Sequence, residues 1–264
     1  MELAAHFHRE VRAFHDAARQ AADDGDAPAV PSCPDWTMSD LVGHLSGVQR
    51  MVTAVIRDRL KGFPDPAQLM AGELPADMTG WPAPDRSPTF GPIPLTLLDW
   101  FAEGADQLER QFREREPGEF AWTWWEQDQT VGFWLRMQTI EAAVHRWDAE
   151  LAIGAARPIH EEIAADAVTQ TFEVMAPARR FLTQAPAGAG ERFGFRRTDG
   201  PGEWVVHFDG EHVRLGDGGA ADVEAAGTAS DLMLFLWHRL PADELDVRGD
   251  KALLDRYFVL VPPV

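Results

Sequence analysis

A glutamate and a histidine four residues apart give the strongest chemical signal in the chain. Glu141 and His145 fall in a segment, residues 130–152, whose apolar residues recur at helical spacing. Side chains four apart on a helix project from the same face, so these two groups could bind one divalent cation together. Zinc, nickel and iron all accept an imidazole plus a carboxylate. The same spacing also arises by chance, so a plain surface pair is the alternative interpretation.

A second histidine offers a third ligand. His44 lies in phase with the apolar positions of a helix expected over residues 37–61, which places it on or beside the inward face. A histidine in that position can equally be a core residue with satisfied polar atoms. With Glu141 and His145 it would complete a two-histidine, one-carboxylate site. Three protein ligands leave coordination positions open, as in catalytic rather than structural metal sites, and bundle cores are a known place for them.

Three further residues could take part in the chemistry or have only a structural or surface role. Asp148 could orient the imidazole of His145 or be a surface acid. Arg146 points to another helix face and is expected to be structural. Cys33 is the single cysteine, which excludes an internal disulfide and a thiolate-rich metal site. Packing is the favoured interpretation of Cys33 over nucleophilic catalysis.

The elements that must position these residues are helical through the first two thirds of the chain. Apolar periodicity and capping signals predict helices, which span residues 2–22, 37–61, 95–115, 130–152 and 158–181. Residues 62–94 hold eight prolines, which a helix does not tolerate. They predict a long irregular loop of the kind that often wraps over a site.

The last third of the chain changes character. Alternating segments separated by Asp-Gly turns predict strands, at residues 192–198, 203–208, 212–215, 221–226 and 245–247. Two short helices are expected at residues 231–239 and 250–259. The predicted architecture is therefore a helical part followed by a small α+β part.

Composition and charge exclude several classes of function. Among 264 residues, 24 Lys and Arg against 43 Asp and Glu give a net charge of −19, which argues against nucleic acid or an anionic membrane surface as the main partner. No apolar run is long enough for a membrane span, and the charged N-terminus has no signal-peptide core. We expect a cytoplasmic protein, with a monomer as the default oligomeric state.

Three stretches of the sequence resemble the mycothiol-dependent maleylpyruvate isomerase family of the DinB-like superfamily. The first, VPSCPDWTMSDLVGHL, covers residues 30–45, and the second, EAAVHRWDAE, covers residues 141–150. The third combines GTASDLMLFLWHRL, residues 227–240, with VRGD, residues 247–250. They follow one another in the order of the family and touch both parts of the chain.

The resemblance implies a fold and a set of metal ligands. It implies a protein of two domains, α plus α/β, with a DinB-like four-helix bundle over residues 1–182 and a small sterol-carrier-like α+β domain over residues 183–264. It also implies a divalent metal held by His44, Glu141 and His145. Zinc is the metal expected from the isomerase branch, and nickel is the alternative.

The resemblance also bears on residues around the metal. Arg239 is the candidate catalytic residue, because a guanidinium fork suits a substrate carboxylate or a polar group of the thiol; a surface salt bridge is the alternative. Trp36 is assigned to cofactor binding as an aromatic wall, with core packing as the alternative. Ile140 and His238 depart from the pattern, which has histidine and glycine there in many relatives. The other candidate wall residues are Trp122, Trp124, Trp125 and Trp134.

The chemistry implied by the family uses a small-molecule thiol, mycothiol. A metal-stabilised thiolate would add to an activated C=C bond of a small, carboxylate-bearing electrophile, allow rotation and leave again, which is cis–trans isomerisation. The same thiolate could remain on the electrophile, which is S-transfer. Metal-activated water would instead make the protein a hydrolase. A non-catalytic module that binds a small ligand is the remaining alternative.

Overall fold

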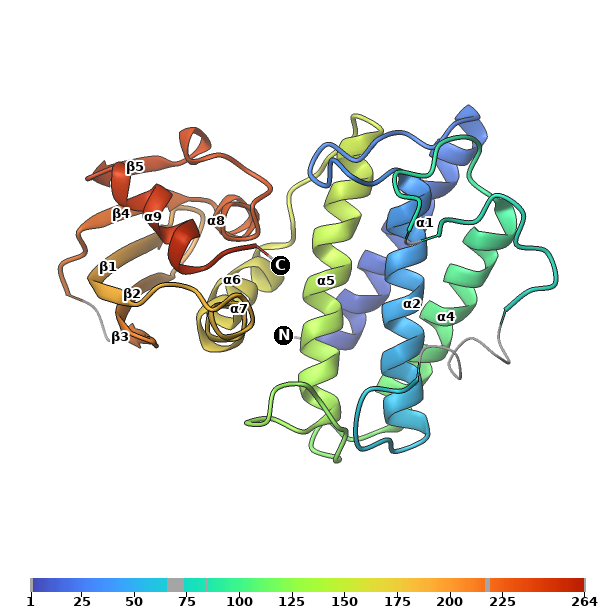
Figure 1. The fold of residues 1–264 in the computed structure, drawn as a ribbon, viewed down its shortest axis with the longest axis horizontal. Helices are drawn as coiled ribbons and strands as arrows, with labels where there is room; N and C mark the ends of the chain where they lie inside the picture. Colours follow the sequence, from blue (N-terminus) through green and yellow to red (C-terminus); the bar gives the residue numbers. More distant parts are fainter. Residues whose placement is uncertain (1, 66–73, 84, 217–218, 264) are drawn as a thin grey trace. The chain divides into compact units, whose positions relative to one another are not determined.

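The computed structural model describes residues 2–65, 74–83, 85–216 and 219–263. These residues form two compact units, Met1–Arg157 and Pro158–Val264 (Figure 1). In the described part of the chain, no helix has both the length and the apolar composition that crossing a membrane requires. Each unit has its own core and is described separately below.

Long helices build the first unit (Figure 1). They are α1 (Leu3–Asp24), α2 (Met38–Arg57), α4 (Leu95–Glu114) and α5 (Val131–Ala152). Helix α1 packs against α4 and α5, and α2 packs against the same two helices, so their apolar faces meet in one core. The predicted helices of this region are confirmed. The fully buried side chains of this core include Phe7, Phe14, Leu41, Leu97 and Ile140.

Capping residues fix where the helices that carry the site begin. At the start of α2, Asp40 accepts a hydrogen bond from the backbone N of Thr37 at 2.8 Å, as in a capping box. At the start of α5, Thr130 Oγ1 accepts a hydrogen bond from Phe133 N at 3.1 Å. These bonds satisfy amide groups that have no partner within the helix.

The proline-rich connection from α2 to α4 returns to the start of α2. Of the loop predicted over residues 62–94, residues 66–73 and 84 lie outside the described residues, and the described parts are irregular as predicted. Thr89 donates to Asp40 from both its backbone N and its Oγ1, at 2.8 Å each. The cap of α2 therefore also anchors the loop.

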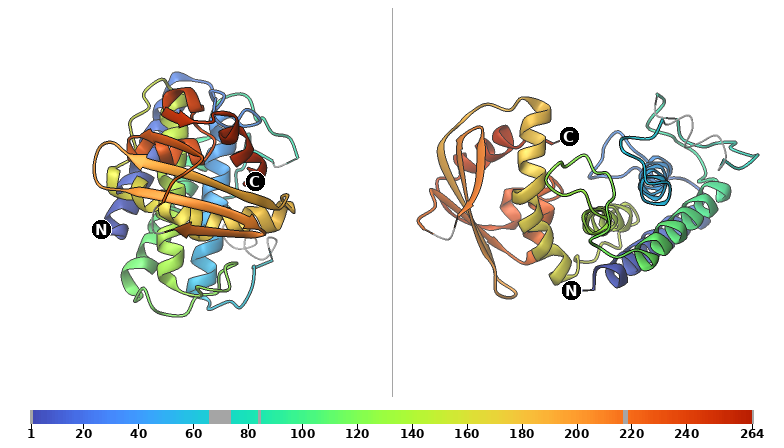
Figure 2. Two further views of the ribbon diagram at one scale, coloured as in Figure 1. Left: turned by 90° about the vertical axis from the view of Figure 1, so that its left-hand side faces the viewer. Right: turned by 90° about the horizontal axis from the view of Figure 1, so that it is seen from below.

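A five-stranded sheet with helices packed on one face forms the second unit (Figure 2). The strand order is β3-β2-β1-β4-β5, with β1 and β4 parallel and the other neighbours antiparallel. The strands are β1 (Gly188–Arg197), β2 (Glu203–Gly210), β3 (His212–Gly216), β4 (Val223–Gly227) and β5 (Asp246–Gly249). The helices are α6 (Glu161–Gln170), α7 (Ala176–Thr183), α8 (Ala229–Leu236) and α9 (Ala252–Leu260).

The single helix predicted over residues 158–181 is interrupted. Between α6 and α7 lies one π-helical turn, Thr171–Met175. Pro177 follows it and lacks the amide hydrogen that a regular helix would direct to the carbonyl of Glu173. The wider turn accommodates that missing bond, which hydrophobic periodicity alone does not reveal.

The division between the units differs from the predicted domain boundary. The units divide between Arg157 and Pro158, whereas the sequence analysis places the boundary at 182/183. Helix α6 packs against α8, and α7 contacts β3, so these helices cover the second core. An amphipathic helix shows which of its faces is buried, but not against which partner.

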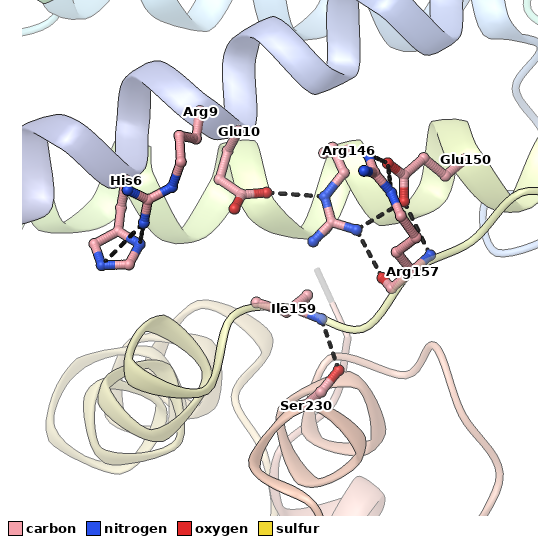
Figure 3. Close-up of polar contacts among 8 residues, drawn as sticks. All are labelled: His6, Arg9, Glu10, Arg146, Glu150, Arg157, Ile159 and Ser230. Carbon is pink, nitrogen blue, oxygen red and sulfur yellow. Dashed lines mark hydrogen bonds and ion pairs between the residues drawn. The ribbon is translucent and has the colours of Figure 1, made fainter.

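An ion-pair network joins α1 to α5 in the first unit (Figure 3). Arg146 donates from Nε to Glu10 and from Nη1 to Glu150, at 2.8 Å each. Burial opposes ionisation of Glu150, but hydrogen bonds from Arg157 and Arg146 hold its pKa below the ordinary value. Arg146 therefore has the structural role that its helix position predicts.

Candidate metal centre

The three predicted metal ligands converge between α2 and α5. One donor atom from each of His44, Glu141 and His145 lies within 4.8 Å of the other two. Nε2 of His44 is 3.4 Å from Oε1 of Glu141, and the two imidazole centroids are 5.1 Å apart. Two ligands about 2.0–2.2 Å from a zinc ion lie about 3.3–3.6 Å from each other in tetrahedral geometry. The 3.4 Å separation of the His44 and Glu141 donor atoms already falls in that range.

A buried carboxylate decides which nitrogen of His145 faces the site. Nδ1 of His145 lies 2.9 Å from Oδ2 of Asp148, which is fully buried. Because a carboxylate accepts, Nδ1 carries the proton and Nε2 keeps its lone pair for a metal. Ser32, a residue that the sequence analysis did not assign to the site, donates to the other oxygen of Asp148 at 2.6 Å. Of the two interpretations of Asp148, the orienting partner is confirmed.

Glu141 is oriented by a residue that the sequence analysis missed. Nε2 of Gln138 donates to Oε2 of Glu141 at 2.6 Å, which leaves Oε1 for the site. Burial raises the pKa of Glu141, but the hydrogen bond with His44 and the nearby imidazoles hold it below the ordinary value. The spacing of three residues on one helix face is the signal that could have identified Gln138.

Trp36 lies against both imidazoles at the edge of a cavity. Its ring centroid is 4.8 Å from that of His44 and 6.4 Å from that of His145. His44 and Trp36 also line a cavity of about 790 Å³ between α2, α4 and the proline-rich loop, a size typical of small-molecule sites. Two further indoles in its wall, Trp81 and Trp100, lie 5.1 Å apart.

The other candidate wall residues do not line this cavity. Trp134 is buried and donates from Nε1 to the carbonyl oxygen of Trp122 at 2.7 Å. Trp124 packs between Trp125 and Phe133, with centroids 6.2 and 5.4 Å away. Trp81 and Trp100 line the cavity instead. Sequence reasoning missed them, because one lies in an irregular loop and the other on a helix stripe already explained by packing.

Arg239 lies in the second unit, where α8 has ended. Its Nη1 donates to the carbonyl oxygen of Trp237 at 2.8 Å, and its role in substrate contact stays a prediction. The preceding residue, His238, has φ 61°, the left-handed region that favours glycine. Histidine tolerates this region better than most residues, which explains how it can replace the glycine of the family pattern.

Matches to family models cover most of the chain. Residues 5–150 match the model described as the mycothiol maleylpyruvate isomerase N-terminal domain, and residues 162–256 match the MDMPI C-terminal domain. The chain belongs to the mycothiol-dependent maleylpyruvate isomerase family. The resemblance found in the sequence is thereby confirmed. Among curated proteins, none matches the sequence significantly.

Two solved structures share the fold of this family member. The crystal structure of the mycothiol-dependent maleylpyruvate isomerase has a TM-score of 0.59 at 14% identity, and a histidine-to-alanine mutant structure has 0.56 at 14%. Each match covers 94% of this chain and 93% of the other. At this identity the likeness shows the fold: a helical N-terminal region and a mixed-sheet C-terminal region.

Two glycines on the cavity face of α2 are expected to respond differently to alanine. A Cβ at Gly47 would meet no atom within 4 Å, whereas one at Gly43 would lie 2.8 Å from Cγ of Pro82. We expect Gly47→Ala to raise the free energy of unfolding by about 1 kcal/mol, since alanine is the better helix former. Gly43→Ala should gain nothing or lose stability, because the loop must move. Urea unfolding measures both, and equal gains would show that the loop does not pack as described.

Proposed function

We propose that this family member is a metal-dependent enzyme that uses mycothiol to isomerise a C=C bond in a small electrophilic substrate. The observation that carries the proposal is the convergence of His44, Glu141 and His145 beside a cavity of small-molecule size. Both similar solved structures are of a protein named as a mycothiol-dependent maleylpyruvate isomerase. Family membership supports the use of mycothiol, and these three side chains support the metal-dependent chemistry.

In the proposed site the chain's own residues hold a cation and orient its ligands. His44, Glu141 and His145 would bind zinc, with nickel as the alternative. The bound cation would supply positive charge that stabilises a thiolate at neutral pH. Two neutral imidazoles and one carboxylate carry a single negative charge, so part of the charge of a divalent ion is left for that thiolate. Asp148 and Gln138 keep His145 and Glu141 in orientation by their hydrogen bonds.

The other residues of the proposed site bind the organic reactants. Trp36 is proposed to contact the thiol, since its ring packs against that of His44 and lies near that of His145. Trp81 and Trp100 present apolar surface to the organic part of the substrate. Separately from these residues, Arg239 in the second unit is proposed as a contact for an anionic group, because a guanidinium pairs with a carboxylate through two parallel hydrogen bonds.

We also propose a more specific fold class for each of the two units. We assign the helical unit to the DinB-like bundles, on the support of the arrangement of α1, α2, α4 and α5 and of ligands that project from α2 and α5. We assign the second unit to the sterol-carrier-like domains, on the support of its five-stranded mixed sheet with helices on one face.

Calorimetry with mycothiol tests the proposal most directly. Zinc-loaded protein is expected to release or absorb heat on titration, while protein freed of metal with EDTA and the His44→Ala variant should not. Absence of heat with zinc-loaded protein would refute the use of this thiol. Candidate electrophiles would then be incubated with enzyme and thiol and followed by mass spectrometry. A product of unchanged mass supports isomerisation, a thioether indicates S-transfer, and the addition of water indicates a hydrolase.

A further inference from the structure

One guanidinium in the second unit is buried, and two of its three nitrogens lack an acceptor among the described residues. Arg179 on α7 is 5% exposed, and its Nε and Nη1 have no hydrogen-bond partner among the described residues. Burial and the charge of Arg239 lower its pKa, the hydroxyl of Tyr257 opposes them, and no Asp or Glu of the described residues is among the causes of the shift. Removing an unpaired cation from water costs free energy. A bound anion would offset that cost.

The neighbouring arginine shows how this fold holds a structural guanidinium by its terminal nitrogens, although its Nε also has no partner among the described residues. Arg180 is also 5% exposed. It donates from Nη1 to the carbonyl oxygen of Leu260 at 2.8 Å, and from Nη2 to those of Pro186 and Gly210 at 3.1 and 2.9 Å. The contrast between two adjacent, equally buried arginines indicates that Arg179 has a function other than holding the backbone.

Further polar atoms around Arg179 are buried and unpartnered among the described residues. They include Nε1 of Trp237 and the hydroxyl of Tyr257. The Cζ of Arg179 lies 5.2 Å from the ring centroid of Trp237. The ring of Tyr257 is fully buried and held by Phe193 and Phe208, whose centroids are 5.4 and 6.0 Å away. The indole and the phenol are rigidly placed donors.

The charges of this cluster favour an anion. Burial raises the pKa of Tyr257, and the charge of Arg179 opposes that effect, so the hydroxyl stays protonated and can donate. Burial and the charges of Arg179 and Arg239 lower the pKa of His238 to about 4, so this imidazole is neutral at pH 7. The guanidinium of Arg179 therefore supplies the positive charge, while hydroxyl and indole groups supply further donors.

We propose that Arg179, Trp237 and Tyr257 form a binding site for the carboxylate group of a small organic acid in the second unit. One carboxylate balances the charge of one guanidinium and accepts from its fork through both oxygens. The surroundings are aromatic, since the ring centroid of Phe258 lies 3.9 Å from that of His238. Such surroundings suit the apolar remainder of an organic acid better than a hydrated phosphate dianion. The site goes beyond the proposed function, since it uses none of the metal ligands.

Thermal unfolding of the full chain in the presence of sodium propionate tests the site, with EDTA present so that no metal contributes. We expect propionate to raise Tm above the value in sodium chloride of equal ionic strength, and its uncharged isostere propionamide to have no effect. Arg179→Met should weaken propionate binding about tenfold or more, because a hydrogen bond to a charged group is lost. Arg196→Met, which removes a cation paired with Glu224 on the same unit, should bind as the wild type does.

A second readout separates a ligand-binding arginine from a structural one. Without propionate, Arg179→Met should keep or raise Tm because it removes an unpaired buried charge, whereas Arg180→Met should lower Tm because three carbonyl groups lose their donor. A marked loss of stability in Arg179→Met would contradict the proposal. Tyr257→Phe, which keeps the ring, should also weaken the response to propionate.

Three outcomes would overturn the carboxylate site. They are an unchanged propionate response in Arg179→Met, an equal response of the wild type to propionamide, and a response to inorganic phosphate without one to propionate. Because the experiment contains neither metal nor thiol, its failure leaves the proposed function standing. Conversely, a failed mycothiol titration leaves this site untouched.

Discussion

Replacing Glu141 by glutamine is expected to lower the affinity of the protein for zinc about a hundredfold. The binding free energy of a four-ligand zinc site is about 10–16 kcal/mol, so one ligand contributes roughly 3 kcal/mol, or about a factor of one hundred. Glutamine keeps the size of the side chain, so the fold should remain intact while the charge at Oε1 is lost. Zinc content after dialysis and competition with a chromophoric chelator measure the loss, and mycothiol binding should fall with it.

Two further variants test the same set of metal ligands. Asp148→Asn should weaken zinc binding about 10–100-fold, the usual effect of losing a group that orients a ligand. Glu103→Gln changes an exposed glutamate on α4 and should leave zinc binding as it is. If Glu141→Gln retained the zinc content of the wild type, the proposed ligand set would be wrong, because no fourth protein donor of the described residues is grouped with these three.

Asp40→Ala is expected to reduce the free energy of unfolding by about 3–5 kcal/mol, since it removes a helix cap and leaves buried donors unpaired. Asp40 is 5% exposed and accepts from Thr37 N and Oγ1, Thr89 N and Oγ1, and Ser87 Oγ, at 2.8–3.0 Å. The substitution removes the anchor of the proline-rich loop as well as the cap of α2. Urea unfolding at pH 7 measures the effect.

The chain offers a matched control for this variant. Asp231 completes the same kind of capping box with Thr228 at the start of α8, and among the described residues its carboxylate accepts hydrogen bonds from Thr228 alone. Asp231→Ala should therefore cost only about 1 kcal/mol, the usual effect of a lost cap. Equal losses in the two variants would show that the loop contacts of Asp40 contribute nothing.

The effect of Asp40 is also expected to depend on pH. Burial opposes its ionisation, but hydrogen bonds from Thr89 and Thr37 hold its pKa below the ordinary value of 3.8. A carboxylate with a depressed pKa in the fold stabilises it above the pKa of the unfolded chain, and this contribution disappears as pH falls through the folded pKa. The difference in stability between wild type and Asp40→Ala should thus shrink at pH values below about 4.

Local signals in the sequence were sufficient for most of the elements and for singling out the candidate metal ligands. Periodicity placed the helices that carry His44, Glu141 and His145, and a capping box predicted where α2 begins. These features depend on residues within a few positions of each other, which is why they can be read without the fold. The family resemblance, now confirmed, added that the two helices meet.

The sequence by itself indicated most of the secondary structure, the family and the three residues proposed to bind a metal together. Only the tertiary structure decided that Ser32 and Gln138 hold the groups around that site, that Trp81 and Trp100 line its cavity, and that α6 and α7 cover the sheet. It alone separates Arg180, whose terminal nitrogens donate to three carbonyl groups, from Arg179, whose Nε and Nη1 have no acceptor among the described residues. Each of these features depends on which distant surfaces pack together, and a periodic pattern states only that a surface is buried.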